Sequence, residues 1–157
     1  MAINTSEATT TQSLNEPAPK LRVYRSVRDA KGSAASEHDS VVLVVHSDRV
    51  MRYRLTMCLE RLGYEVIAVS TAERAKWALE HEPGRIDAVL ASHHLHRSAG
   101  RELLHFVARQ HPEVKRILMP EAGSNYPAND VDPAIDHVVF DARGDMTSVL
   151  SAMFGVK

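Results

Sequence analysis

Five consecutive aliphatic residues, Val41–Val45, constrain the fold of this chain more than any other segment. A strand with one face in water alternates apolar and polar residues, whereas a strand of a parallel sheet is buried on both faces and apolar throughout. A second apolar run, broken only by Asp87, follows at residues 86–91. We therefore expect a parallel sheet with helices packed on both faces.

Strand and helix patterns alternate after residue 40. We expect five strands, at residues 41–45, 64–69, 86–91, 114–119 and 135–140, and a short last helix at 146–154. Three longer helices are expected to begin after Ser47 or Asp48, at Ser70-Thr71 and after Gly100, with Gly63 ending the first in the left-handed conformation. Apolar residues recur at three- and four-residue steps in that first helix, at Val50, Leu55, Cys58, Leu59 and Leu62. This alternation predicts a doubly wound α/β fold.

The segment between the fourth and fifth strands breaks this regularity. Residues 121–133 contain Gly123, Pro127 and Pro133 among short polar residues. Proline removes a hydrogen bond inside a helix and costs about 3 kcal/mol there. The fourth helix is therefore expected to be short or irregular.

A length of 157 residues fits one domain with an additional tail. Residues 1–40 show no apolar periodicity and are expected to form a disordered tail, which leaves 41–157 as the folded domain. Within the tail, the segment 20–31 holds five basic residues and one acidic residue. It is either a solvated linker or a short motif that becomes ordered on a partner.

Composition excludes several classes of function. The formal net charge of −1 gives no reason to expect nucleic-acid binding, and no helix-turn-helix pattern follows the domain, so direct DNA binding is not expected. No segment approaches the ~20 apolar residues of a membrane span. The single cysteine, Cys58, suits a reducing compartment and a buried structural role. We expect a cytoplasmic protein.

Four short sequence motifs in the folded region occur in an order and at a spacing typical of one protein family. They are Leu-Val-Val at 43–45, Leu-Glu-Arg-Leu-Gly-Tyr-Glu-Val at 59–66, Asp-Ala-Val-Leu-Ala-Ser at 87–92 and Gly-Arg-Glu-Leu-Leu at 100–104. Together they resemble a response-regulator receiver (CheY-like) domain, over about 115 residues. The resemblance implies a flavodoxin-like five-stranded parallel sheet with strand order 2-1-3-4-5.

The resemblance also places the functional positions of the family, and each is altered here. His46 and Ser47 stand where the family has two magnesium-binding acids, and Ser92 stands at the phosphate-accepting aspartate. Four further positions differ: Pro120 at the hydroxyl residue after strand four, Phe140 at the lysine of strand five, Asp141 at the following proline, and His137 at the aromatic switch. Leu95 and His96 replace the usual Met-Pro. The pocket for phosphorylation is degenerate in sequence.

These replacements remove the chemistry of phosphate transfer. Magnesium needs oxygen ligands that include carboxylates, and His46 and Ser47 supply none. A serine without an adjacent base is a weak nucleophile, and without the lysine no cation would hold a transferred phosphate. We expect no catalytic residue, no cofactor and no phosphate acceptance.

The histidines suggest alternatives. His46, His93, His94 and His96 could gather at one edge of the sheet and bind a metal, although no cysteine accompanies them. Protonation of His46 or His137 could act as a pH switch. A hydrolase built on Ser92 would lack both the Gly-x-Ser-x-Gly elbow and an oriented carboxylate.

Two features favour contact with another protein. Arg49, Arg52, Arg54 and Arg61 lie on or near the first helix, as either a solvated face or a docking surface for an acidic partner. Trp77 is either an interface anchor or a packed core residue. The sequence therefore predicts a phosphorylation-independent receiver that serves as an interaction adaptor in a two-component-type system. Its partner would be a histidine kinase, another regulator or an output protein. The alternative is a small-ligand or metal sensor that uses the crevice at the strand ends.

Overall fold

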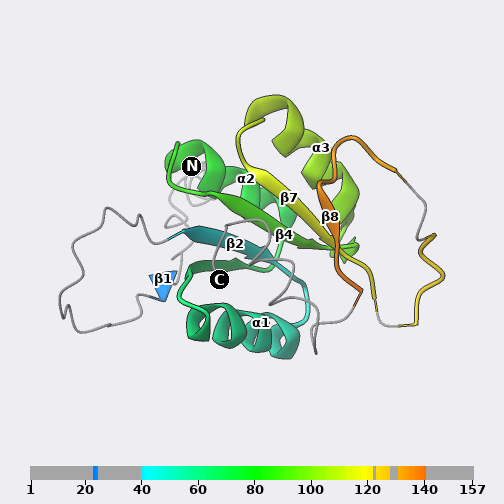
Figure 1. Cartoon of the computed structure of the whole chain (residues 1–157), viewed down its shortest axis with the longest axis horizontal. Coiled ribbons are helices and arrows are strands. Elements are labelled where there is room, and N and C mark those ends of the chain that lie inside the picture. Colours follow the sequence, from blue (N-terminus) through cyan, green and yellow to red (C-terminus); the bar gives the residue numbers. More distant parts are fainter. Residues whose placement is uncertain (1–22, 25–39, 122, 128–130, 141–157) are drawn as a thin grey trace, which may run out of the picture.

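The computed structural model describes residues 23–24, 40–121, 123–127 and 131–140. They contain a six-stranded sheet in the order β1-β3-β2-β4-β7-β8 (Figure 1). The strands are β1 (Val23–Tyr24), β2 (Val41–Val45), β3 (Glu65–Val69), β4 (Ala88–Ser92), β7 (Lys115–Met119) and β8 (His137–Val138). The last five are mutually parallel, which confirms the predicted order 2-1-3-4-5 and the flavodoxin-like fold class.

Strand β1 comes from the segment that we expected to belong to the tail. Val23 pairs with Ile67 and Tyr24 with Val66, antiparallel to β3. The sheet therefore gains a sixth strand at the margin next to β3. The rest of residues 1–39, including the remainder of the basic segment, lies outside the described residues.

Alternate residues of β2 belong to two separate cores. Val41, Leu43 and Val45 pack into a core that includes residues of α2 (Ala72–His81) and α3 (Gly100–Gln110). Val42 and Val44 pack into the core that includes residues of α1 (Arg49–Arg61). Figure 1 shows α1 on one side of the sheet and α2 and α3 on the other. The uniformly apolar sequence of β2 thus reflects burial on both faces, as predicted.

Helix α1 begins and ends as the sequence predicts. The side chain of Asp48 accepts a hydrogen bond from the backbone N–H of Met51 at 2.8 Å, which satisfies one of the free donors of the first turn. Gly63 follows the helix with a φ of +98°, a conformation that favours glycine.

The predicted apolar face of α1 was wrong at Val50, and Cys58, which we expected to be buried, is only partly buried. Leu55 and Leu59 are buried against the sheet, but Val50 is 64% exposed. At 3.6 residues per turn, Val50 lies about 140° around the helix from Leu55 and faces away from the sheet.

Helix α2 contains the single tryptophan of the chain. Trp77 is partly buried, and its ring stacks on that of His81 one turn later, with 4.1 Å between centroids. His81 also bonds to the carbonyl of Trp77 at 2.8 Å. The indole is therefore held by a contact within its own helix.

Irregular structure connects β7 to β8. The described residues between Pro120 and Asp136 contain no helix, in agreement with the expected short or irregular fourth helix. A small hairpin of β5 (His94–Leu95) and β6 (Ser98–Ala99) precedes α3 and was not predicted. The expected helix at 146–154 lies outside the described residues. No helix in the described part of the chain has the length and hydropathy to cross a bilayer.

Candidate functional site

The carboxyl ends of β2, β4 and β7 bring the predicted pocket positions to one edge of the sheet. Val45 pairs with Ala91, and Ser92 pairs with Met119, so His46, Ser92 and Pro120 follow or end neighbouring strands. Ser92 and Pro120 are buried, His46 is partly buried, and Ser47 is exposed. The sequence therefore placed these residues at the edge where open α/β sheets bind ligands.

His46 is tied to the start of α1. Its Nδ1 accepts a hydrogen bond from the backbone N–H of Asp48 at 3.0 Å. The guanidinium of Arg52 donates to the carbonyls of His46 at 2.6 Å and Ser47 at 3.2 Å. Burial, together with the charge of Arg52, lowers the pKa of His46 below its usual value of 6.5, although the nearby carboxylates oppose the shift. The imidazole is therefore neutral at physiological pH.

Two acidic side chains lie near this edge. Asp48 points its carboxylate at the first turn of α1, where it caps the helix. Glu121 is exposed, and its charge acts to raise the pKa of both His46 and His93. Asp141 lies outside the described residues.

The four candidate metal ligands do not form a metal site in the described structure. Among the described residues, no three His, Cys, Asp or Glu side chains are placed to hold one ion. His94 and His96 are exposed on the β5–β6 hairpin, and the rings of His93 and His94 meet edge to face at 4.5 Å. This geometry does not favour the metal-sensor interpretation.

A row of aromatic rings, which was not predicted, crosses the same edge. The ring of His93 meets that of Tyr126 edge to face at 5.6 Å, and Tyr126 meets Phe140 at 6.1 Å. The guanidinium of Arg101 donates to the Tyr126 hydroxyl at 2.6 Å. We call His93, Tyr126 and Phe140 the aromatic row. It joins the end of β4 to the loop after β7 and to Phe140, which follows β8 and Val139.

The loop that carries Tyr126 is fastened to α3 by Asp132. The Asp132 side chain is 7% exposed, and it accepts hydrogen bonds from the Ala134 backbone N–H and from His105, both at 2.9 Å. The Nε of Arg101 lies 3.5 Å from the same carboxylate. Burial opposes ionisation, but these partners outweigh it and lower the pKa of Asp132. Asp132 therefore stays charged and holds the irregular loop on the helix.

His137 and Phe140 differ in their surroundings. His137 is exposed on β8, opposite Ile117 of β7. Phe140 is 44% exposed and contacts Tyr126. Phe140 thus belongs to the aromatic row, whereas His137 lies on the outer strand of the sheet.

The lowered pKa of His46 predicts a pH-dependent stability. Because the unfolded chain binds a proton near pH 6.5 and the folded chain resists it, stability is expected to fall as pH drops from about 7.5 to about 5.5. Burial also lowers the pKa of His93 and adds to the same trend. His46→Asn keeps an acceptor for the Asp48 N–H and should reduce this loss, measured by thermal unfolding across the pH range. The same substitution at exposed His96 is the control, and an equal slope in both variants would refute the assignment.

No protein-family model matches this chain, and no curated protein sequence matches it. Solved structures do share its fold. The response regulator TrrA of Thermotoga maritima, in complex with Mg²⁺-BeF, is 22% identical over 73% of this chain and 97% of its own, with a TM-score of 0.63. A signal receiver domain from Pseudomonas fluorescens is 24% identical over 73% and 92%, with a TM-score of 0.62. A CheY-like receiver domain from Methanospirillum hungatei is 23% identical over 74% and 90%, with a TM-score of 0.62. The chain therefore has the fold of receiver domains.

Proposed function

We propose that this chain is a degenerate receiver that binds a protein partner in a two-component-type regulatory system and accepts no phosphate. The buried Ser92 carries this proposal. It ends β4 and is 3% exposed, and the resemblance aligns it with the family's phosphate acceptor. The same resemblance aligns His46 and Ser47, which are not carboxylates, with the magnesium-binding acids. Of the carboxylates described near this edge, Asp48 caps α1 and Glu121 is exposed, so the edge offers magnesium a poor set of ligands.

The aromatic row supports the same proposal. Receivers switch when a phosphate changes the charge of the pocket and the protein repacks. Here His93, Tyr126 and Phe140 contact one another across the strand ends, and Asp132 fastens the loop that carries Tyr126. The output of such a module is binding. A solved structure with 23% identity and a TM-score of 0.61 holds a response regulator in complex with a histidine kinase. A kinase, another regulator or an output protein is the partner class that we propose.

A phosphate-donor assay tests the proposal directly. The chain is incubated with Mg²⁺ and acetyl phosphate, and its intact mass is measured beside that of a response regulator that accepts phosphate. We expect no added phosphoryl group, and no shift in melting temperature with Mg²⁺ and beryllofluoride, because neither ion has a ligand set at this edge. A phosphoryl group on Ser92 or on any aspartate would overturn the proposal.

A further inference from the structure

The junction between β2 and α1 is held by a hydrogen bond that requires an unprotonated histidine. The backbone N–H of Asp48 donates to Nδ1 of His46 at 3.0 Å. An imidazole nitrogen accepts a hydrogen bond only through a free lone pair, and both ring nitrogens of a protonated histidine are donors. A proton on Nδ1 would therefore set two donors against each other, and the contact would become repulsive.

The same aspartate caps α1. Its carboxylate accepts a hydrogen bond from the backbone N–H of Met51 at 2.8 Å. This bond lowers the pKa of Asp48, so the carboxylate stays charged over the range in which a histidine titrates. The first turn contains no acidic residue, and Arg49 at its first position is unfavourable there because the helix dipole is positive at this end. The first turn of α1 thus depends on Asp48.

Three charged groups among the described residues act on the imidazole of His46. Asp48 and Arg52 belong to the same junction, and Glu121 follows β7. Burial has the largest influence and lowers the pKa of His46; the two carboxylates oppose burial, and Arg52 adds to it. On β3 the contact is made by backbone, since the His46 N–H donates to the carbonyl of Val69 at 3.1 Å. Asp48 has the strongest effect of the three charges, so its carboxylate is the main attractive partner of a protonated imidazole.

We propose that His46 and Asp48 form a pH-sensitive switch for the first turn of α1. In the neutral state, the imidazole accepts the Asp48 N–H, and the Asp48 carboxylate caps the helix at Met51. On protonation, the imidazolium gives up the N–H and attracts the carboxylate, which leaves the Met51 N–H and opens the first turn. The proton is then an input to this fold that needs neither magnesium nor a phosphate acceptor, and it goes beyond the proposed function.

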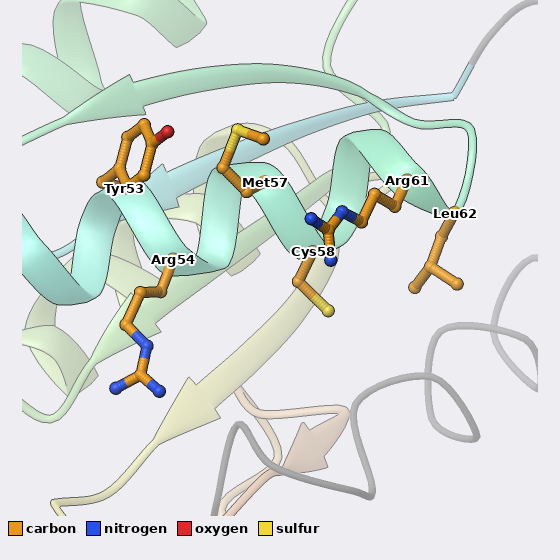
Figure 2. A pocket seen from close by; sticks show the side chains of 6 residues that line it. All are labelled: Tyr53, Arg54, Met57, Cys58, Arg61 and Leu62. Atoms are coloured by element: carbon orange, nitrogen blue, oxygen red, sulfur yellow. The ribbon is translucent and has the colours of Figure 1, made fainter.

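The rest of α1 stays in place in both states. The guanidinium of Arg52 donates to the carbonyls of His46 and Ser47, and neither of these bonds involves a group that gains or loses a proton. Figure 2 shows the later turns of the helix, from Tyr53 to Leu62. Cys58 in this part lies about 15 Å along the helix axis from the cap. Opening is therefore confined to the first turn.

The test compares two capped helices within the same full chain. Helix α2 is capped by the Thr71 hydroxyl, which accepts the Arg74 N–H at 3.3 Å and carries no titratable proton in this range. NMR measures the exchange of backbone amides with water from about pH 7.5 to about 4.5, relative to the intrinsic rate at each pH, and follows the His46 ring in the same samples. We expect the protection of the Met51 amide to fall by about fivefold as His46 gains its proton, because loss of a cap changes helix opening by roughly this factor. The amides of Arg74 and Cys58 should keep their protection.

Two substitutions separate the parts of the switch. His46→Asn keeps an acceptor for the Asp48 N–H without a titratable group, so the Met51 amide should stay protected at acidic pH. Asp48→Asn keeps a neutral cap but removes the charge that the imidazolium attracts, so His46 should still gain a proton while the Met51 amide stays protected. His96→Asn, at an exposed histidine of the β5–β6 hairpin, is the matched control and should respond as the parent chain does. Circular dichroism verifies that each variant is folded.

Any of four results would overturn the switch. The Met51 and Arg74 amides could lose protection together, which would indicate general unfolding by acid. The Met51 amide could keep its protection while His46 titrates, His46→Asn could leave the response of Met51 unchanged, or the His46 ring could stay neutral over the whole range. Phosphate labelling of the chain bears on the proposed function alone, because no step of the switch involves a phosphate.

Discussion

Ser92→Asp, which would supply the aspartate that the family resemblance predicts at this position, is expected to destabilise the protein by about 3 kcal/mol and to leave it unable to accept phosphate. Ser92 is 3% exposed, so a carboxylate there would lose its hydration. Among the charges that reach the neighbouring histidines, Glu121 would repel the new carboxylate, whereas Arg52 and Arg101 would attract it but are already bound to other groups. The new carboxyl would avoid part of the cost by remaining protonated, with a raised pKa. Urea unfolding measures the loss, and acetyl phosphate with Mg²⁺ tests the chemistry.

Two substitutions isolate the effect of charge at this position. Ser92→Asn has nearly the same shape as the aspartate but no charge, and Ser92→Ala removes only the hydroxyl. Both should cost clearly less than Ser92→Asp, with alanine within about 1 kcal/mol of the parent. A stable, phosphorylated Ser92→Asp variant would show that a hidden magnesium site exists and would contradict the proposed function.

Gly100→Ala is expected to cost about 3 kcal/mol, although alanine is the better helix former. A Cβ at this position would lie 1.9 Å from the carbonyl oxygen of Ser92. Because the obstacle is backbone, no side-chain rotation relieves it, and either the start of α3 or the end of β4 must move. The Gly100 N–H also bonds to the carbonyl of His93 at 2.9 Å, so the movement would disturb the aromatic row. Thermal and urea unfolding measure the loss.

Gly84→Ala is the matched control for this effect. Gly84 has a φ of +74°, but an added Cβ would meet nothing within 4 Å. Its substitution should cost about 1 kcal/mol, the usual penalty for a left-handed alanine. Equal losses at Gly84 and Gly100 would mean that the close approach of α3 to β4 has no energetic importance.

The sequence predicts the sheet well because a strand that is buried on both faces is apolar throughout, and such runs can be read directly from the sequence. Val41–Val45 is apolar throughout since both faces are covered, and the order of the strands follows from the alternation and the family resemblance. The ends of the strands then place His46 and Ser92 at one edge without further information. These features depend on local periodicity and on general rules of chain connection.

Contacts between distant segments could not be predicted in the same way. Tyr126 lies in a segment without periodicity, and its contact with His93 depends on how that loop folds back onto α3. Asp132 gives no sign in the sequence that its carboxylate is buried. The position of Val50 among other apolar residues predicts a buried side chain, but its angle of about 140° from Leu55 around the helix turns it to the solvent.

Strand β1, which comes from the N-terminal segment, covers the margin of the sheet next to β3. The backbone of Val66 and Ile67 would otherwise offer open hydrogen-bonding groups beside apolar side chains, a template onto which a strand of another molecule can add. Two residues, Val23 and Tyr24, occupy that template from within the same chain. The segment before the domain thereby closes this margin of the sheet, along Val66 and Ile67, to the addition of a strand from another molecule.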